Sequence, residues 1–557
     1  MSTAAFGFSP TLPSTDIAAA DLFSFNVGQR QSEILRLGRC FSVGYARKQP
    51  GAQKIVVMQS KSPKPPVRAL HSVRSTILVG LICLITVGSA LGGFLIGRNA
   101  TRDTFIQRIN TISGAEGVTL ISAGSAPISL YHVLGKESLD DPVTAQALAK
   151  AYNIAGDDRE QLFRHLRNVN WIPPYRPVPF VGHMARPVFG NDLRINVLGF
   201  RDERDSYVNK PEGTVRIFLT GGSTAWGSGA SSQQDTISYK LERLLNEHVG
   251  STTGYKYEVI NTAFPAWSTT QERILIEQRL IDMHPDAVLM FSGNNDVHWS
   301  QAGRDIRWYY SYPDESYLLL LNEAFEASGH PEWGVGSPSA SPPAQCADLG
   351  RTTAGNVGQA AALSARVGAR LIFALQPNIV STAKGLTRYE QRILQRQNKT
   401  YWDSCYQALR DELGKLEARN YNFIDLSRSF GELDDRTELF IDSYHFADLG
   451  NRLIARALLD QIDWKSIAPG KAFASDMEPL SIIKLDRAGA TVQITPNRLS
   501  KNLLAVLDQS VFPTVVAGES IVLTLPASLR VPGGSHTIHI VDGMTGETSQ
   551  TIALDSR

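Results

Sequence analysis

Ser223 stands where an apolar run ends in two glycines, a setting that suits a nucleophile. Residues 215–219 are rich in β-branched and aromatic side chains, as in a buried strand. Gly221 and Gly222 allow the backbone to turn sharply and leave the serine uncovered. The same pattern also fits a glycine-rich turn whose serine only caps the next helix. Taken alone, the stretch leaves both interpretations open.

Asp442 and His445 offer the partners that a serine nucleophile needs. They lie three residues apart, just before a predicted helix, so a loop over the edge of a sheet can bring them together. Acyl transfer by a serine requires a base, a carboxylate that orients the imidazole, and hydrogen-bond donors for the oxyanion. Asn295 follows another apolar run and can supply one such donor. The combination of Ser223, His445, Asp442 and Asn295 predicts an acyl-transfer site.

A parallel sheet is expected to position these residues. Short apolar runs alternate with helical patterns from about residue 191 onward, which is typical of a sheet covered by helices on both faces. The predicted strands are 215–219, 257–260, 287–291, 371–375 and 423–426, and the predicted helices are 237–248, 270–283, 355–367, 388–419 and 447–462. Because sites in such sheets lie at the carboxyl ends of strands, segments 221–223, 261–263 and 292–296 are expected on one rim.

Four ordered blocks resemble those of the SGNH (GDSL-like) hydrolase family, over about residues 189–464. The blocks are Gly221-Gly222-Ser223-Thr224, Asn261-Thr262-Ala263-Phe264-Pro265-Ala266, Gly293-Asn294-Asn295-Asp296 and Asp442-Ser443-Tyr444-His445. The Gly-Gly-Ser-Thr form is similar to that of membrane-linked bacterial members, as is the upstream segment 196–201. The resemblance implies a flavodoxin-like, three-layer α/β fold with a parallel sheet, and a serine hydrolase that cleaves ester bonds.

The resemblance also implies a role for each block. Ser223 would be the nucleophile, His445 the base and Asp442 the carboxylate that orients it. The oxyanion would be bound by the backbone N–H groups of Ser223 and Ala263 and by the side chain of Asn295. No cofactor or metal ion is implied.

The second block departs from the family pattern. Alanine stands at positions 263 and 266, where family members usually carry glycine. A donor at Ala263 therefore requires backbone dihedrals that a residue with a Cβ can adopt. This departure is also the feature that favours a non-catalytic interpretation of the chain.

Substrate contacts are expected beside the blocks and in a long insertion. Trp226, Asn294 and Trp299 are candidate substrate-binding residues. The insertion, about residues 297–349, is far longer than a usual connection and rich in Trp and Tyr, which favours a lid or a binding wall. Aromatic faces suit sugar rings, acyl chains and plain packing alike.

The segment Ser75–Gly97 predicts a transmembrane helix. It carries no charge over about 23 residues, enough at 1.5 Å per residue to cross about 30 Å of hydrocarbon. Basic residues are more numerous before the segment than after it, which predicts a cytoplasmic N-terminus and a periplasmic or extracellular catalytic domain on the plasma (inner) membrane. The small-xxx-small spacing of Gly88 and Gly92 would suit a homodimer of such helices.

The remaining composition bounds the function. Lys and Arg number 55 against 54 Asp and Glu, a balance that argues against a nucleic-acid binder. Cys346 and Cys405 would pair in an oxidising compartment, although two buried free thiols explain the sequence as well. The predicted parts are a disordered tail (1–74), the span (75–97), a helical and linker region (98–188), the hydrolase-like domain (189–470) and a small β-sandwich-like domain (476–557).

The leading functional prediction is a membrane-anchored, extracytoplasmic esterase. It would remove an acyl group, most plausibly O-acetyl, from a cell-envelope glycan or a related ester. One alternative is an O-acyltransferase that modifies an exopolysaccharide together with other proteins of that pathway. Another is a non-catalytic scaffold that binds a glycan or a partner protein. The first half of the reaction is shared by the two enzymes, so the residues alone do not separate them.

Overall fold

The computed structural model describes residues 127–154, 158–190, 192–205, 207–334, 341–473, 478–508, 510–525 and 535–555. The predicted tail (1–74) and the predicted membrane span (75–97) lie outside these residues. Within the described residues, no helix combines the length and the apolar character that crossing a bilayer requires.

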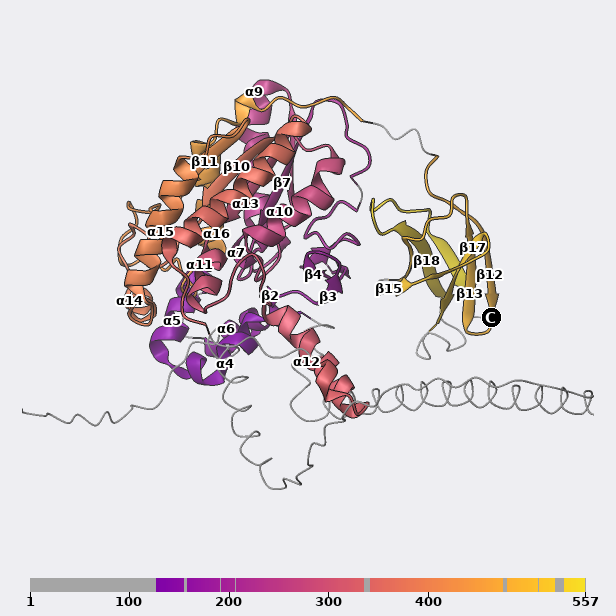
Figure 1. The fold of residues 1–557 in the computed structure, drawn as a ribbon, viewed down its shortest axis with the longest axis horizontal. Helices are drawn as coiled ribbons and strands as arrows, with labels where there is room; N and C mark the ends of the chain where they lie inside the picture. The colour runs from indigo at the N-terminus through magenta and orange to yellow at the C-terminus, as the bar shows by residue number, and fades with distance from the viewer. Residues whose placement is uncertain are drawn as a thin grey trace, which may run out of the picture. The chain divides into compact units, whose positions relative to one another are not determined.

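A five-stranded parallel sheet forms the core of the region that carries the four blocks (Figure 1). Its strands, in spatial order, are β8 (Lys256–Asn261), β7 (Thr214–Gly221), β9 (Ala287–Ser292), β10 (Arg370–Leu375) and β11 (Tyr421–Asp425). Numbered along the chain, this order is 2-1-3-4-5, the flavodoxin-like arrangement. Every residue of β7 is buried, as its apolar run predicts. Strand β8 lies on one side of β7 and strand β9 on the other, so the connections that follow β7 and β8 run in opposite directions across the sheet. This reversal creates a topological switch point beside the end of β7.

Helices cover the sheet in two groups. Helices α10 (Thr269–Gln278), α13 (Cys346–Arg366) and α15 (Lys399–Gly414) pack side by side, whereas α8 (Ile237–Leu245) packs against α16 (Asp448–Gln461). Right-handed crossovers explain the division, because the chain moves one way from β7 to β8 and the opposite way from β8 to β9, β10 and β11. The expected three-layer α/β architecture is therefore present.

Two predicted helices differ from the observed ones. The predicted helix 388–419 is two helices, α14 (Arg388–Gln395) and α15, because the side chain of Asn398 accepts a hydrogen bond from the N–H of Tyr401 and starts a new helix. The predicted helix 355–367 begins earlier, at Cys346, inside the predicted insertion. Cys346 is disulfide-bonded to Cys405 of α15, with their Cα atoms 4.5 Å apart.

The insertion after β9 is largely helical instead of an open loop. It contains the end of α11 (Asn294–Gln301), then α12 (Tyr312–Ala327) and the short 3-10 helix η4 (Pro331–Trp333). Residues 318–334 belong to a second compact unit, in which the ring of His330 stacks on Trp333 at 4.0 Å. The residues up to 317 belong to the same unit as the sheet.

The region before the sheet is folded. It contains α4 (Leu130–Asp140), α5 (Pro142–Ala151), α6 (Arg159–Asn168) and a short antiparallel pair formed by β1 (Ile128–Ser129) and β2 (Asn170–Ile172). The cap of α6 is Asp158, whose side chain accepts a hydrogen bond from the N–H of Gln161. After β2 the chain forms an antiparallel hairpin of β3 (Tyr175–Val178) and β4 (Gly182–Ala185).

The C-terminal region is all-β, as expected. Two four-stranded antiparallel sheets contain β12 (Ile482–Ala488), β13 (Thr491–Pro496), β17 (Ser520–Thr524) and β16 (Val515–Ala517) in one, and β15 (Ser510–Pro513), β14 (Leu503–Leu507), β18 (Ser535–Asp542) and β19 (Ile552–Asp555) in the other. Their apolar faces share a separate core that includes Ile494, Ile521 and Ile538. A β-sandwich follows from this arrangement.

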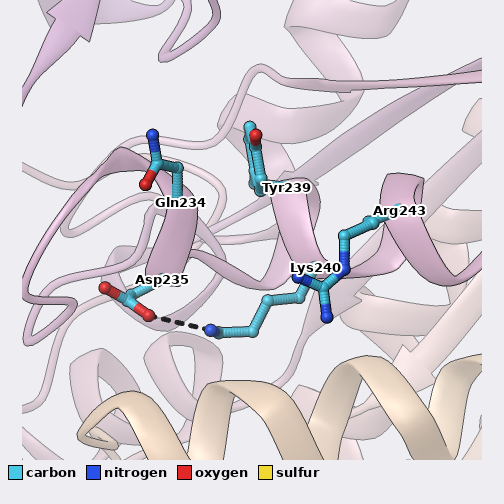
Figure 2. A pocket seen from close by; sticks show the side chains of 5 residues that line it. All are labelled: Gln234, Asp235, Tyr239, Lys240 and Arg243. Carbon is cyan, nitrogen blue, oxygen red and sulfur yellow. Dashed lines mark hydrogen bonds and ion pairs between the residues drawn. The ribbon is translucent and has the colours of Figure 1, made fainter.

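A hollow of about 300 Å³ lies over α8 and the preceding 3-10 helix η1 (Gln233–Asp235) (Figure 2). It is lined by Gln234, Asp235, Tyr239, Lys240 and Arg243, and Lys240 forms an ion pair with Asp235. None of these residues directly follows a strand of the sheet, whereas ligand sites in open α/β sheets lie at the carboxyl ends of the strands.

Candidate active site

Ser223, His445 and Asp442 are connected in one hydrogen-bonded relay. Ser223 is the first residue of α7 (Ser223–Trp226), directly after β7. Its Oγ lies 2.6 Å from Nε2 of His445, and Nδ1 of the same ring lies 2.7 Å from Oδ2 of Asp442. His445 is almost fully buried, and the Asp442 side chain is about one-quarter exposed. The structure thus brings together the three residues that the sequence selects from distant blocks.

The loop that carries Asp442 holds the carboxylate in its ionised form. Oδ1 of Asp442 accepts hydrogen bonds from the backbone N–H groups of Tyr444 at 3.0 Å and His445 at 2.8 Å. Burial alone would raise the pKa of Asp442, but the adjacent imidazole and these N–H donors together hold it below the ordinary value. Asp442 is therefore set to orient the ring and to balance a positive charge on it.

Both glycines before Ser223 are required by close contacts. Gly221 has a φ of 151°, and a Cβ there would lie 2.3 Å from the backbone oxygen of Phe291 on β9. A Cβ on Gly222 would lie 2.1 Å from Nδ2 of Asn295. The absence of side chains at these positions lets the Asn295 amide approach the peptide that precedes Ser223.

The carbonyl groups of the one-turn helix α7 are bound by two buried side chains. Asn261 donates from Nδ2 to the oxygens of Ala225 at 3.0 Å and Trp226 at 3.2 Å. The guanidinium of Arg201 donates to the oxygens of Trp226 at 3.2 Å and Gly227 at 3.1 Å, and burial lowers its pKa to about 9. A cation at the carboxyl end of a helix is favoured by the helix dipole. These bonds hold the turn that presents Ser223.

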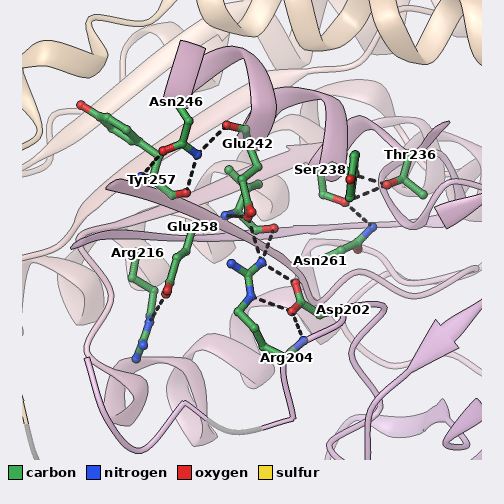
Figure 3. Close-up of polar contacts among 12 residues, drawn as sticks. Asp202, Arg204, Arg216, Thr236, Ser238, Glu242, Asn246, Tyr257, Glu258 and Asn261 are labelled. Carbon is green, nitrogen blue, oxygen red and sulfur yellow. Dashed lines mark hydrogen bonds and ion pairs between the residues drawn. The ribbon is translucent and has the colours of Figure 1, made fainter. Parts of the chain in front are cut away.

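The segment after Arg201 is fixed to α8 by a polar network (Figure 3). Arg204 forms ion pairs with Asp202 at 2.8 Å and with Glu242 at 2.9 Å. Glu242 also accepts the backbone N–H of Val259 on β8 at 2.7 Å. The network thus holds the chain directly after Arg201, the last residue of the upstream segment 196–201.

The predicted donor Ala263 is corrected by the structure. Its N–H is already donated to Oδ1 of Asn261 at 3.2 Å. The left-handed backbone that a glycine would favour occurs instead at Ala266, whose φ is 72°. Among the described residues no acceptor takes the Ala266 N–H, and the Ala266 oxygen accepts bonds from Nε1 of Trp299 and the hydroxyl of Tyr309, both at 3.0 Å.

The other two predicted oxyanion donors lie beside the nucleophile. The N–H of Ser223 is at the free amino end of α7 and has no acceptor among the described residues. Nδ2 of Asn295 donates one hydrogen to the oxygen of Trp267 at 2.7 Å, which leaves its second hydrogen for a ligand.

The three candidate substrate contacts are buried and bonded within the protein, and their role in substrate binding stays a prediction. Trp226 has no exposed surface and lies under the Arg201 guanidinium at 4.3 Å. Asn294 is buried and bonded through its oxygen to Tyr406 and Asn378. Trp299 is 8% exposed and donates to the Ala266 oxygen, so it orients a peptide near the site.

Two residues near the relay, Trp171 and Glu390, are not identified by the sequence patterns. The ring of Trp171, from β2, lies 4.4 Å from the His445 ring, and no motif surrounds it in the sequence. Glu390, at the start of α14, is fully buried and binds the backbone just before Asp442. The only sequence signal for Glu390 is its capping box with Thr387, which predicts a helix start and nothing more.

Among the described residues, no group of three or more His, Cys, Asp or Glu side chains is arranged to hold a metal ion. The relay and its neighbouring donors supply the groups that acyl transfer by a serine requires: a nucleophile, a base, a carboxylate and N–H donors.

No protein-family model and no curated protein matches the chain. Among solved structures, the acetyl xylan esterase AlAXEase is similar at 15% identity and a TM-score of 0.27, over 44% of this chain and 100% of that one. The acetylxylan esterase Axe2 from Geobacillus stearothermophilus is similar at 17% identity and a TM-score of 0.27, over 45% of this chain and 94% of that one. TesA is similar at 10% identity and a TM-score of 0.27, over 44% and 98%.

These identities are too low to carry an activity to this chain. The observed fold is consistent with the resemblance to the SGNH hydrolases: the sheet has the strand order 2-1-3-4-5, Ser223 and Asn295 follow its strands, and Asp442 and His445 lie in a later loop.

Proposed function

We propose that the chain is a serine esterase that removes an acyl group, most plausibly acetyl, from a hydroxyl of a cell-envelope glycan or a related ester. The observation that carries the proposal is the relay from Ser223 Oγ through His445 to Asp442, with bonds of 2.6 and 2.7 Å. A serine hydroxyl hydrogen-bonded to an imidazole, which a carboxylate orients in turn, is the arrangement that activates oxygen nucleophiles.

In the first half of the reaction, His445 takes the proton of Ser223 through Nε2 while Oγ attacks the acyl carbon. A tetrahedral intermediate forms, and its collapse breaks the ester bond as His445 returns the proton to the departing alcohol. In the second half, water loses a proton to His445 and attacks the acyl-enzyme, and the collapse of this second tetrahedral intermediate breaks the bond to Ser223 Oγ. His445 returns the proton to Oγ, which releases the acid and restores Ser223. Asp442 stays ionised and stabilises the imidazolium in both halves.

We assign the oxyanion to three donors: the N–H of Ser223, Nδ2 of Asn295 and the N–H of Ala266. The assignment of Ala266 in place of Ala263 is supported by the bond that already occupies the Ala263 N–H. Trp299 and Tyr309 bind the Ala266 oxygen and so fix the direction of that peptide, while Ala266 itself supplies the left-handed backbone.

We further propose that the site lies outside the cytoplasm and is anchored by the segment 75–97. The charge bias around that segment supports this orientation. The Cys346–Cys405 bond supports it independently, because disulfides persist mainly in oxidising compartments. The glycan substrate is favoured only by the envelope location that this orientation implies.

The test is turnover of p-nitrophenyl acetate by the purified chain and by its Ser223→Ala variant. Wild type should release p-nitrophenol with an acyl-enzyme burst, and the variant should fall to the background rate. Thr224→Ser is a matched control in the same turn, since the one hydrogen bond that the Thr224 hydroxyl makes among the described residues, to the oxygen of Tyr444 at 3.3 Å, can also be made by serine. Equal turnover by wild type and Ser223→Ala would contradict the proposal.

The same assay separates hydrolysis from transfer. An oligosaccharide acceptor is added, and the products are analysed for acetate and for acetylated sugar. A pure esterase gives acetate at an unchanged rate. If acetylated sugar appears with wild type and not with Ser223→Ala, the reaction is acyl transfer instead of hydrolysis, and it proceeds through the same acyl-enzyme.

A further inference from the structure

The region before the hydrolase sheet reaches into the relay. Trp171 lies on β2, outside the four sequence blocks, and its indole centroid is 4.4 Å from the imidazole centroid of His445, with the rings inclined by 57°. The Trp171 side chain is largely buried, at 9% exposed. Tyr444 contacts the same imidazole from its own loop at 4.7 Å. The base is therefore in contact with two aromatic rings from segments far apart in the sequence.

The strand that carries Trp171 is fastened to the segment that follows the nucleophile. The Trp171 oxygen accepts the hydroxyl of Ser228 at 2.6 Å, and the Asn170 oxygen accepts the N–H of Gly229 at 3.4 Å. From α5's end, the hydroxyl of Tyr152 donates to the Gly229 oxygen at 2.8 Å. These bonds fix the position of the β2 backbone relative to the segment after α7, and therefore the position of the Trp171 Cα from which the indole extends.

Gly229 shows how closely these segments are packed. Its φ is 94°, and a Cβ at this position would lie 2.6 Å from the backbone oxygen of Phe446 and 2.6 Å from Cδ1 of Ile441. The segment 228–229 is thus held between β2 and the loop that carries Asp442 and His445. The backbone that carries the Trp171 indole therefore cannot move away from the His445 loop without disturbing that packing.

We propose that Trp171 is a positioning residue for His445: its indole keeps the imidazole directed at Ser223 and stabilises the ring when it carries the proton. The inference rests on the proposed esterase function. An aromatic face attracts a cation placed against it, and a packed ring restricts rotation of the imidazole away from its partners. The active site then includes the region 127–188, which the sequence assigns to a helical linker.

The first test compares Trp171→Phe with Trp171→Leu in the full chain, using p-nitrophenyl acetate. Phe keeps an aromatic face, whereas Leu keeps apolar bulk without one. We expect Trp171→Leu to lower kcat about tenfold or more with little change in KM, and Trp171→Phe to stay within about threefold of wild type. Equal kcat values for the two variants would overturn the proposal, provided that their melting temperatures agree.

The second test does not need turnover. A protonated imidazole quenches the fluorescence of an indole in contact with it, so the difference between the emission of wild type and Trp171→Phe reports on this pair. That difference should change with pH in wild type, and His445→Gln should abolish the change. A pH-independent difference would overturn the proposal.

The turnover assay and the fluorescence measurement together separate failure of the proposed esterase function from failure of the proposed role of Trp171. If no form of the chain turns over an ester but the fluorescence difference follows the protonation of His445, the proposed function fails and the contact stands. If turnover is normal and the fluorescence difference is flat, the proposed function stands and the role of Trp171 fails.

Discussion

At the scale of single residues, the nucleophile depends on close backbone approaches as much as on the relay. Gly221 leaves space for Phe291 of strand β9, and Gly222 leaves space for the side-chain amide of Asn295 on α11, so both reach the backbone just before Ser223. Any side chain at position 222 would displace Asn295 from its place beside the nucleophile. The glycines thus allow the nucleophile Ser223, which follows β7, to lie beside the oxyanion donor Asn295, which follows β9.

Ala266 is expected to behave unlike Ala263 when either is changed to glycine. The left-handed conformation costs alanine about 1–2 kcal/mol, so Ala266→Gly should raise the free energy of unfolding by up to about 1 kcal/mol and keep kcat/KM. Ala263 has no positive φ, so Ala263→Gly should lower that free energy by about 0.5–1 kcal/mol. Chemical denaturation of both variants measures the difference. The opposite order of stabilities would contradict the backbone assignment.

Glu272 gives the fold a dependence on pH. Its fully buried carboxyl accepts hydrogen bonds from Ser292 at 2.6 Å and Thr220 at 2.7 Å. Burial raises its pKa to about 8, although these two bonds act in the other direction. Because the folded pKa lies above the unfolded value of about 4.3, the proton on Glu272 stabilises the fold below that value, and this contribution is lost as the pH rises through 8.

Glu272→Gln should remove the loss of stability that wild type shows as the pH rises, because the amide does not titrate. The melting temperature of wild type should fall relative to the variant between about pH 5 and pH 9, which calorimetry at several pH values measures. Exposed Glu247, which forms an i,i+4 ion pair with Arg243, is the matched control, and Glu247→Gln should follow wild type at every pH. Parallel curves for wild type and Glu272→Gln would contradict the assignment of the raised pKa.

At the scale of elements, helix α14 holds the segment that leads to Asp442. One oxygen of Glu390 accepts the N–H groups of Leu439 at 3.0 Å and Phe440 at 3.1 Å. The other oxygen binds Lys384 Nζ at 2.5 Å, and both side chains of this ion pair are fully buried. The hydroxyl of Tyr389 donates to the Ile441 oxygen at 2.5 Å. The start of α14 therefore sets the position of the residue before Asp442.

Glu390→Gln should weaken both the fold and the chemistry. A buried Lys384 left without its carboxylate costs about 3–5 kcal/mol, and the freed 439–441 segment should lower kcat more than it changes KM. The control on the same helix is Arg392→Gln, which removes a half-exposed ion pair with Asp141 and should cost at most about 1 kcal/mol. Denaturation and steady-state kinetics measure both effects. A Glu390→Gln protein as stable and active as Arg392→Gln would contradict this role of α14.

The sequence predicts the elements whose signals are local. All five strands of the sheet are found from their apolar runs, and Ser223, Asp442 and His445 from their spacing at strand or helix ends. It does not predict Trp171 or Glu390, because their roles depend on contacts between segments distant in sequence. It does not separate Ala263 from Ala266 as the third oxyanion donor, because the two differ in a backbone dihedral, which two alanines do not reveal in a sequence.

At the scale of the whole molecule, the disulfide joins two neighbouring helices of one layer. Cys346 starts α13 and Cys405 lies within α15, 59 residues apart in sequence. Cross-linking a loop of this length restricts the unfolded chain and is worth about 4 kcal/mol on the entropic estimate. The bond also fixes the end of the insertion to the sheet's helical cover.

The Cys346→Ser, Cys405→Ser double variant should therefore lose up to about 4 kcal/mol of unfolding free energy. A reductant should lower the stability of wild type and leave the double variant unchanged, since Cys346 and Cys405 would no longer be present. Urea denaturation with and without reductant measures this. If both thiols of native wild type react with an alkylating agent before reduction, the bond is absent and the argument for an oxidising compartment fails with it.

The central claim is that Ser223 is a nucleophile activated by His445 and Asp442. The most direct measurement is the rate at which a fluorophosphonate probe adds to the purified chain, followed by intact mass and by mapping of the labelled peptide. The account predicts one addition, on Ser223, that is lost in Ser223→Ala and slowed by orders of magnitude in Asp442→Asn, in which the tautomer of His445 is wrong. A wild-type chain that stays unlabelled, or a Ser223→Ala variant labelled at the wild-type rate, would contradict it.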